Sequence, residues 1–352
     1  MRVLMLTQKI DRDDDRLGFM HGWAAALATR VDALRILALA VGRYDLPANV
    51  IVESMGKERG AGRPGLLFSF YRGLLRHLRQ VDAVFIHMIP RFAILAAPAA
   101  ALYRKPMTLW YTHRAASPEL RLAARLVQKI ATAHPTSFPL PNPKVRALGH
   151  GIDTAAFAPG THPPEEPPVI VSLARLSPIK RHETLLRAAA LLRDQYGDPP
   201  ARFVIAGGAV SAEDAAYEQM LRQQITWLRL GDRAALWGAV PADSVGAVFH
   251  DASVAVNLSP PGLFDKAVLE AMLCGLPVVV ANAAFDDILG DHAARLRIPD
   301  GADAAALAAR LADLLALSPE ERRAIGLDLR ARAAAAHSLD KLMDRLVALL
   351  RE

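Results

Sequence analysis

Cysteine is nearly absent from this sequence: Cys274 is the only one among 352 residues. A single cysteine excludes an intrachain disulfide framework and a zinc or iron–sulfur site built from clustered thiolates. The sequence also lacks an H-E-x-x-H pattern, so we expect no metal cofactor. This cysteine usage fits a reducing compartment, and we expect the protein to be cytoplasmic.

Long apolar runs are also lacking. The longest uncharged apolar stretch, residues 92–103, falls well short of the ~18 residues that a membrane-spanning helix needs, and Pro98 interrupts it. Only five residues separate Arg2 from the polar Gln8, which is too few for the apolar region of a signal peptide. We therefore expect neither a membrane span nor a secretion signal.

Two nucleotide fingerprints are missing as well. Without a G-x-G-x-x-G motif or a P-loop, a nicotinamide dehydrogenase and a nucleoside triphosphatase lose their main support. The net charge of +6 implies attraction to something anionic. The basic residues are spread out, and no zinc-finger, RNP or basic-zipper signature is present, so we expect no nucleic-acid partner.

The chain length and one proline-rich stretch predict two domains. Residues 159–168 contain five prolines, which cannot join a helix or a central strand. We therefore expect a first domain over 1–158, a linker over 159–168, a second domain over 169–338 and a final helix over 339–352.

Both halves alternate short apolar runs with helical stretches, which predicts an α/β protein with parallel sheets buried on both faces. The expected architecture is two Rossmann-like, doubly wound domains that face a cleft. The expected strands include 3–6, 83–86 and 107–110 before the linker, and 169–171, 203–206, 254–256 and 278–280 after it.

Two cations follow the first strand of the second half. That strand ends near Leu173, and the loop after it carries Arg175 and Lys180 ahead of an amphipathic helix. Ligands of open α/β sheets lie beyond the carboxyl ends of the strands, so the two cations suit a diphosphate. A solvated basic loop remains the alternative interpretation.

A second group of residues follows the strand that ends near Asn257. A Pro/Gly loop leads to a helix that starts near Asp265, a favourable N-cap. Glu270 lies in this helix among apolar neighbours and needs a partner, for which a ribose diol is suitable. The alternative is that Glu270 pairs with a neighbouring arginine. Gly207 and Gly238 end further strands, where backbone is able to approach a ligand closely.

The first half offers weaker candidates. His87 and His113 each follow an expected strand, although a structural role for each stays open. The acidic run 11–15 lacks a calcium-loop spacing, which favours a solvated loop. Residues 66–79 mix large apolar side chains with arginines, a pattern compatible with an anionic membrane surface or with a packed helix that has a basic outer face.

Taken together, these segments resemble the GT-B nucleotide-sugar glycosyltransferases, specifically retaining family 4 (glycosyltransferase group 1). Residues 174–181 resemble the family's G-R-L-x-x-x-K-G diphosphate loop, and residues 268–279 match the end of its E-x7-E motif. Residues 148–159 resemble its pre-hinge signature. The resemblance covers residues 145–280 well and the first half more loosely.

The resemblance implies a retaining hexosyltransferase that moves a sugar from a nucleoside-diphosphate sugar to the hydroxyl of a sugar or lipid-linked acceptor. Such enzymes act in bacterial surface polysaccharide or glycolipid synthesis, in the cytoplasm or at the inner face of the membrane. It also implies that the C-terminal helix crosses back to the first domain. No metal cofactor is implied.

The resemblance assigns roles by position. The catalytic residues would be His113, Arg175 and Lys180, with the two cations on the departing diphosphate. The donor-binding residues would be Gly238, Val240, Gly262, Phe264, Asp265, Lys266, Ala267 and Glu270. The acceptor side would include Gly18, His21 and His87.

The sequence departs from the family pattern in two places. Gly262 stands where the motif has its first glutamate, and we expect Asp265 and Lys266 to take over sugar and phosphate contacts. The family's glycine pair after the first strand is also absent, with Gly18 and Gly22 nearby instead.

Two alternatives stay open. A non-catalytic nucleotide-sugar-binding protein is one, because Gly262 replaces a motif carboxylate, and a GT-B epimerase or phosphorylase is the other, because it shares the cleft and the phosphate chemistry.

Overall fold

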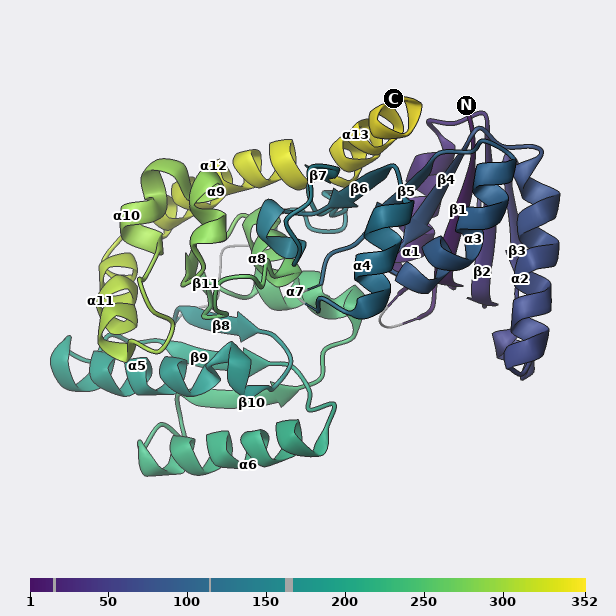
Figure 1. Cartoon of the computed structure of the whole chain (residues 1–352). Coiled ribbons are helices and arrows are strands. Elements are labelled where there is room, and N and C mark those ends of the chain that lie inside the picture. The colour runs from purple at the N-terminus through teal and green to yellow at the C-terminus, as the bar shows by residue number, and fades with distance from the viewer. Residues whose placement is uncertain (15–16, 114, 162–166) are drawn as a thin grey trace. The chain divides into compact units, whose positions relative to one another are not determined.

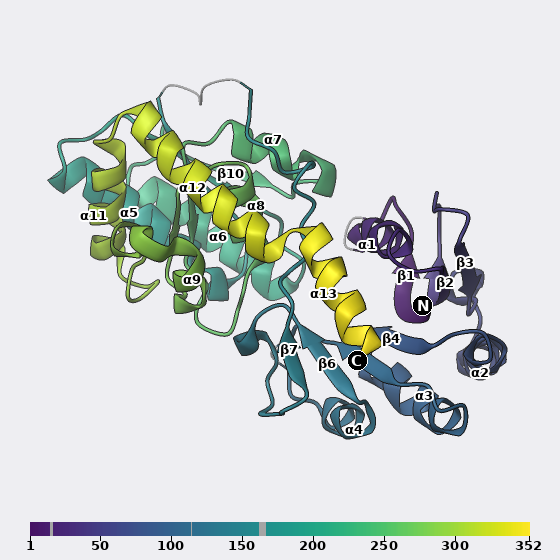
Figure 2. The ribbon, with the colours of Figure 1, turned by 90° about the horizontal axis from the view of Figure 1, so that it is seen from above.

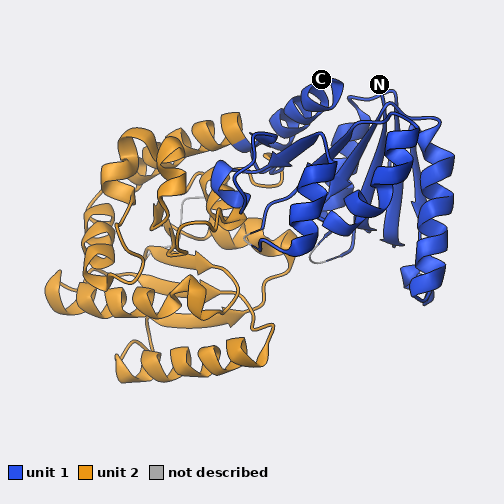
Figure 3. Ribbon diagram, viewed as in Figure 1, with its two compact units in different colours: residues 1–153, 337–352 blue, residues 154–336 orange. Residues whose placement is uncertain are grey.

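The computed structural model describes residues 1–14, 17–113, 115–161 and 167–352. The chain forms two compact units (Figure 3). Unit 1 contains residues 1–153 and 337–352, and unit 2 contains residues 154–336. From the sequence, we expected the first domain to end at residue 158 and the second domain to end at residue 338. Residues 162–166 of the expected linker and residue 15 of the acidic run lie outside the described residues.

Unit 1 is built on a seven-stranded sheet in the order β3-β2-β1-β4-β5-β6-β7, and every neighbouring pair is parallel (Figure 1). The strands are β1 (Arg2–Ile10), β2 (Ala33–Val41), β3 (Val50–Ser54), β4 (Ala83–His87), β5 (Met107–Trp110), β6 (Lys129–Thr132) and β7 (Val145–Ala147). The helices are α1 (Phe19–Ala28), η1 (Lys57–Arg59), α2 (Arg63–Leu78), α3 (Pro90–Leu102), α4 (Pro118–Leu126), η2 (Pro135–Ser137) and α13 (Leu339–Arg351).

Helices cover both faces of this sheet (Figure 2). Alternate residues of β1 point to opposite faces, so Val3 and Met5 join one apolar cluster while Leu4 and Leu6 join the other. The first cluster includes α1 and α13, and the second includes α2, α3 and α4. Helix α13 therefore completes the core of unit 1, which explains why the last residues return to the first domain.

Unit 2 contains a five-stranded parallel sheet in the order β10-β9-β8-β11-β12. The strands are β8 (Val169–Leu173), β9 (Arg202–Ala206), β10 (Ala234–Gly238), β11 (Val254–Asn257) and β12 (Val278–Val280). The helices are η3 (Pro178–Lys180), α5 (His182–Gln195), α6 (Ala212–Trp227), η4 (Ala242–Ser244), α7 (Val245–His250), α8 (Lys266–Leu273), η5 (Ala283–Phe285), α9 (Asp286–Leu289), η6 (Gly290–His292), α10 (Ala293–Leu296), α11 (Ala304–Leu315) and α12 (Pro319–His337).

Each sheet begins near its centre and is wound outward in both directions. The connections reverse between β1 and β4 in unit 1 and between β8 and β11 in unit 2. This is the doubly wound, Rossmann-like topology, and it confirms the predicted α/β class. Its switch points are the places where such sheets bind ligands. Among the described residues, none of the helices is long and apolar enough to cross a membrane.

Buried histidines make the fold sensitive to acid. His337 is 6% exposed, its carbonyl accepts hydrogen bonds from the amides of Gly151 and Ile152, and its Nδ1 accepts one from the amide of His150. Burial, aided by nearby cationic groups, lowers the pKa of His337 to about 3. The folded protein therefore holds this ring neutral at pH values where an unfolded histidine is protonated.

We predict that His337→Asn reduces the acid sensitivity of unit 1. The unfolded histidine titrates near pH 6.5, so one such ring costs about 1.4 kcal/mol of unfolding free energy between pH 7.5 and 5.5. Asparagine keeps an acceptor for the His150 amide and does not titrate. Urea unfolding at both pH values, followed by the fluorescence of the buried Trp23 and Trp110, measures the difference. An identical pH-dependent loss in the variant would contradict the prediction.

Candidate active site

Four of the unit 2 candidates meet at the switch point of its sheet. Arg175 and Lys180 follow β8, while Asp265 and Glu270 follow the adjacent β11. Because the strands are parallel, both loops emerge at the same carboxyl edge. The sequence prediction that β8 ends near Leu173 is confirmed.

Lys180 and Asp265 form the centre of a hydrogen-bonded cluster. The Lys180 ammonium lies 2.8 and 2.7 Å from the two Asp265 oxygens and 3.2 Å from Ser259 Oγ. Asn257 donates from Nδ2 and Ser259 from Oγ to Asp265 Oδ2, at 2.9 and 2.5 Å. The side chains of Lys180 and Asp265 are 14% and 17% exposed. The ammonium is thus fixed by a partly buried carboxylate.

This contact revises the expected role of Asp265 in the local fold. Asp265 is the N-cap residue of α8, but its side chain makes no capping hydrogen bond. Its carboxylate binds Lys180 instead, because the charged pair is the stronger interaction. The predicted N-cap position of Asp265 is thus confirmed, but its carboxylate serves Lys180 instead of the helix amides.

Arg175 is held less tightly. Its Nε lies 3.8 Å from Asp214 Oδ2, and its side chain is 52% exposed, whereas Asp214 is buried. The Arg175 carbonyl is fixed by His182, whose Nε2 lies 3.3 Å away. Burial lowers the pKa of His182 to about 4, so the ring is neutral: Nε2 donates to this carbonyl, and Nδ1 accepts from the Ser172 hydroxyl. The backbone at Arg175 is thus anchored while its guanidinium faces solvent.

Glu270 is buried and paired. It is 7% exposed, and its Oε1 lies 2.8 Å from the Lys266 ammonium, one helical turn away. The partner of Glu270 is therefore a lysine, whereas the alternative interpretation of the sequence expected an arginine. Lys266 is 41% exposed and its ammonium lies 6.0 Å from the centre of the Phe157 ring.

The loop between β11 and α8 explains the missing motif glutamate. Gly262 adopts a φ of 87°, a left-handed conformation that strains a residue with a side chain. A glutamate at this position would require a different loop path. Phe264 is buried and stacks on Phe285 with ring centres 4.4 Å apart, so its backbone rather than its ring is available to a ligand. Ala267 is partly buried beside an internal cavity of about 10 Å³.

The glycine-ended strands β9 and β10 also reach this edge. A Cβ at Gly207 would lie 1.9 Å from the Ala174 carbonyl oxygen, so the space there is filled by the chain itself rather than left for a ligand. Gly238 has a φ of 78° and nothing within 4 Å of where a Cβ would lie. Backbone at Gly238 therefore borders open space, and Val240, two residues later, is partly buried.

In unit 1, His87 lies at the switch point within an aromatic cluster. Its ring centre is 5.5 Å from that of Trp23 and 6.2 Å from that of Phe19. Burial lowers the pKa of His87 to about 3, so the ring is uncharged at neutral pH. The next residue, Met88, has a φ of 62°, and its sulfur accepts a hydrogen bond from the Thr112 amide. Such strained backbone concentrates at functional sites.

The other unit 1 candidates are placed separately. His113 is exposed after β5, and its Nδ1 accepts a hydrogen bond from the Ala115 amide, which leaves Nε2 as the outward donor. His21 accepts a hydrogen bond from the Asp45 amide. Gly18 packs so closely on the Asp14 carbonyl that a Cβ would lie 2.6 Å from its oxygen.

A cavity of about 540 Å³ lies beside the carboxyl end of β1. Its lining includes Lys9 and Asp14. Lys9 makes ion pairs of 2.9 and 2.7 Å with Asp11 and Asp14, so part of the acidic run is paired rather than simply solvated. Within the described part of the chain, no group of three or more metal-ligating side chains is placed to hold an ion.

Sequence reasoning missed the residues that position the site. Asn257 and Ser259 orient Asp265, Asp214 faces Arg175, and His182 fixes the loop backbone. Asn257 and His182 lie beside the sequence motifs described above, at the ends of a strand and a helix. Their positions in the sequence could therefore have indicated a role in the site. Asp214 gave no such signal because it lies on α6, far from Arg175 in sequence.

Comparison with known proteins identifies the domain that carries this site. Residues 154–328 match the family model of the glycosyl transferases group 1. These residues form a group 1 glycosyltransferase domain. The domain contains Arg175, Lys180, Asp265 and Glu270, and the predicted resemblance is confirmed.

Two curated relatives of the domain are named for the same activity. The D-inositol 3-phosphate glycosyltransferase of Mycolicibacterium vanbaalenii is 27% identical over 216 residues, which cover 57% of this chain and 47% of the relative. The protein of the same name from Jonesia denitrificans is 29% identical over 163 residues, 40% of this chain and 35% of the relative. The matches thus span about half, or less, of these relatives.

Solved structures resemble the whole chain. Anabaena HepE in complex with UDP and glucose has a TM-score of 0.73 at 18% identity, over 99% of each chain. Sucrose-phosphate synthase from Thermosynechococcus elongatus has a TM-score of 0.72 at 16% identity, over 100% of this chain and 98% of that chain. At this identity the likeness concerns the fold, and it confirms the predicted GT-B class.

We predict strong coupling between Lys180 and Asp265. The double-mutant cycle of Lys180→Met and Asp265→Ala, measured by urea unfolding with circular dichroism, should give an interaction energy of about 1–2 kcal/mol, because the pair is largely buried. The exposed Arg222–Glu218 pair is the matched control, with about 0.5 kcal/mol or less expected. Additive losses at Lys180 and Asp265 would show that the pair is not a stabilising unit.

Proposed function

We propose that this protein is a retaining glycosyltransferase that moves a sugar from a nucleoside-diphosphate sugar to an acceptor hydroxyl. The observation that carries the proposal is the group of Arg175, Lys180 and Glu270 at the switch point of a group 1 glycosyltransferase domain. Two cations beyond the end of β8 suit a diphosphate, and a buried carboxylate on the next helix suits a ribose diol.

Each group has a distinct role in this proposal. Arg175 and Lys180 bind the diphosphate and stabilise the charge that develops as it leaves. Glu270 accepts hydrogen bonds from the ribose hydroxyls, backbone near Gly238 and Val240 faces the base, and His113 contacts the transferred sugar. The acceptor side includes Gly18, His21 and His87.

Both candidate lysines are paired with carboxylates, so these ion pairs have to change when the donor binds. Lys180 gives up part of its contact with Asp265 to reach the diphosphate, and Lys266 does the same with Glu270. Asp265 and Lys266, once released, are available to the sugar and phosphate in place of the motif glutamate missing at Gly262. Donor binding therefore exchanges internal ion pairs for ligand contacts.

The proposed reaction proceeds on one face of the sugar. The bond between the anomeric carbon and the diphosphate oxygen breaks through an oxocarbenium-like state, and the acceptor oxygen bonds to the same face. The acceptor proton passes to the departing diphosphate. Neither an enzymic nucleophile nor a metal ion is part of this proposal.

The comparisons suggest which substrates to test first. The HepE structure contains UDP and glucose, so uridine diphosphate sugars are the leading donor class. The curated relatives are named for D-inositol 3-phosphate, which makes a phosphorylated polyol a first acceptor beside sugar and lipid-linked acceptors. A role in bacterial surface glycan or glycolipid synthesis is consistent with either.

We predict that one nucleoside diphosphate raises the melting temperature of the purified chain well above the others. A ligand at about 100 times its Kd adds about 2.7 kcal/mol of stability. Thermal-shift measurements with UDP, GDP, ADP, TDP and their sugars provide the comparison. The shift should disappear in Arg175→Ala or Glu270→Ala, while Arg222→Ala on the exposed face of α6 should retain it.

Turnover assays complete this test. Arg175→Ala should lower the rate by roughly 10²–10³-fold, because the leaving diphosphate loses a charge partner. Unchanged kinetics in both Asp265→Ala and Lys266→Ala would remove these two residues from the donor contacts. Nucleotide binding without transfer would favour the non-catalytic alternative, product analysis would reveal an epimerase or phosphorylase, and no nucleotide shift at all would overturn the donor proposal.

We further propose peripheral contact with an anionic membrane through α2, at the cytoplasmic face. Phe68 is 70% exposed, and Arg72 and Leu75 lie on the same side of the helix at 55% and 43% exposure. An aromatic ring and an aliphatic side chain beside arginines are the composition of an interfacial helix. This surface would bring the enzyme close to a lipid-linked acceptor.

We predict that the chain sediments with vesicles of phosphatidylglycerol but not with vesicles of phosphatidylcholine. Phe68→Ser and Arg72→Gln should each weaken sedimentation, and added salt should release the protein because it screens the charges. Trp227→Ser is the control, since this side chain is 80% exposed in unit 2. Equal binding to both lipids, or equal loss in the Trp227 variant, would contradict a specific role for α2.

A further inference from the structure

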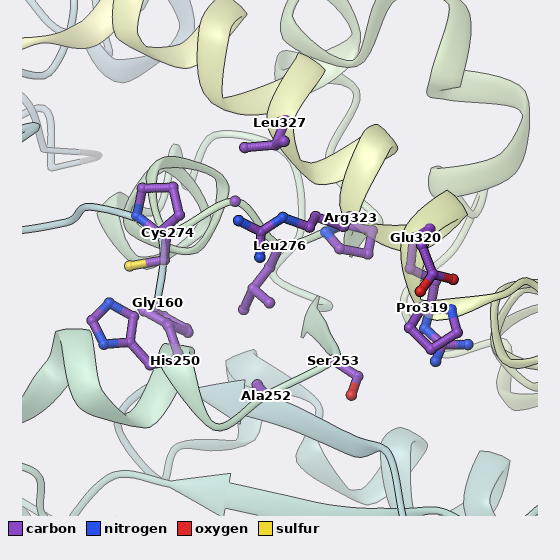
Figure 4. A pocket seen from close by; sticks show the side chains of 15 residues that line it. Gly160, His250, Ala252, Ser253, Cys274, Leu276, Pro319, Glu320, Arg323 and Leu327 are labelled. Carbon is purple, nitrogen blue, oxygen red and sulfur yellow. The ribbon is translucent and has the colours of Figure 1, made fainter. Parts of the chain in front are cut away.

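Figure 4 shows a second cavity, of about 270 Å³. It lies at the opposite edge of the unit 2 sheet from the proposed donor-binding residues. Ala252 and Ser253 precede β11, and Leu276 and Pro277 precede β12, so this is the amino edge. The remaining lining comes from the chain before β8, the end of α7, the end of α8 and the first half of α12: Pro159, Gly160, Phe249, His250, Cys274, Gly275, Pro319, Glu320, Arg322, Arg323 and Leu327.

Close packing fixes the wall that α12 contributes. A Cβ at Gly326 would lie 1.8 Å from the Gly275 carbonyl oxygen, so the helix rests directly on the turn that lines the cavity. Arg330 ties the same helix to its neighbours, donating to the carbonyls of Phe157 and Leu273. The cavity therefore lies between elements that are braced against one another within one unit.

A buried positive charge lies in this wall. Arg322 is 7% exposed, and its Nη1 donates to the carbonyls of Leu314, Leu315 and Leu317, at and just beyond the end of α11. Carbonyl dipoles offset a full charge only in part, and in the described ranges Arg322 has no carboxylate within ion-pair distance. An anion in the cavity would improve the balance of charge.

A second guanidinium borders the same space. The Arg323 side chain extends over Leu276 (Figure 4), and it forms no ion pair with any residue that the structure describes. Among the residues that the structure describes, the lining contains two arginines and one acidic residue, Glu320. This excess of positive charge favours a negatively charged ligand.

The rest of the lining is largely apolar. Phe249 and Cys274 are buried, Leu276 is 6% exposed, and Leu327 closes the rim. The volume is slightly below the ~300–1,000 Å³ of pockets for drug-sized ligands, so a single ring or a short alkyl chain fits. Apolar walls beside a guanidinium group suit a ligand with both characters.

We propose that this cavity is a second binding site, for a small molecule that carries one carboxylate or phosphate on an apolar body. The anionic group binds at Arg323, with the buried Arg322 adding positive charge to the wall, and the apolar body packs on Phe249, Leu276 and Leu327. The site is distinct from the proposed donor site, because the two lie at opposite edges of the sheet.

Cys274 gives this proposal a specific readout. It is the only cysteine in the chain and lines the cavity, so alkylation by N-ethylmaleimide, followed by intact mass, reports on occupancy. Phenyl phosphate is the probe. The matched control ligands are phenol, which lacks the charge, and inorganic phosphate, which lacks the apolar body. Phenyl phosphate at ten times its Kd should slow alkylation roughly tenfold, and the other two should have little effect.

Substitutions in the lining test whether phenyl phosphate binds in this cavity. Arg323→Gln and Leu327→Glu, both at exposed positions, should weaken phenyl phosphate binding roughly tenfold each, while Arg295→Gln elsewhere in unit 2 should not. Protection should persist in Arg175→Ala, which separates this site from the donor site. Titration calorimetry on the same proteins gives a second measurement that does not depend on thiol reactivity.

Two results would overturn the proposal. Equal protection by inorganic phosphate would mean that a surface arginine binds anions without an apolar pocket. No binding of phenyl phosphate by either alkylation or calorimetry would mean that the cavity does not accept this class of ligand.

Discussion

Burial of both sheet faces is the constraint on which the rest of the structure depends. A parallel sheet needs helices on each side, so its central strands are accessible to a ligand at their ends. In unit 1 this requirement draws α13 from the end of the chain into the core beside α1. In unit 2 it leaves two edges, one with the proposed donor-binding residues and the other with the cavity beside α12.

Charge pairing then shapes the carboxyl edge of unit 2. Asp265 binds Lys180, and Glu270 binds Lys266, so two of the candidate cations are neutralised before any ligand arrives. Arg175 is the exception, with a long contact to Asp214 and half of its side chain exposed. Buried pairs of this kind are costly to break one partner at a time, because the remaining charge is left buried without a partner.

Much of the fold was predictable because burial leaves a local pattern in sequence. Apolar runs such as 83–86 and 254–256 lie in strands, and their alternation with helices indicated the doubly wound topology. The candidate site was predictable only where it adjoins those strand ends. Asp214 was missed because its contact with Arg175 joins segments far apart in the chain, and the capping role expected for Asp265 was lost to a stronger partner.

The sequence by itself determined the most apolar strands and the residue types that follow them, because each depends on neighbours within a few positions, whereas the order of the strands in each sheet came from the tertiary structure. Only the tertiary structure decided which charges pair, that Gly262 needs a left-handed backbone, and that Arg322 is buried against helix carbonyls. Those outcomes depend on how loops from different strands meet in space. Distance between side chains, rather than their order in the chain, sets the energy of each contact.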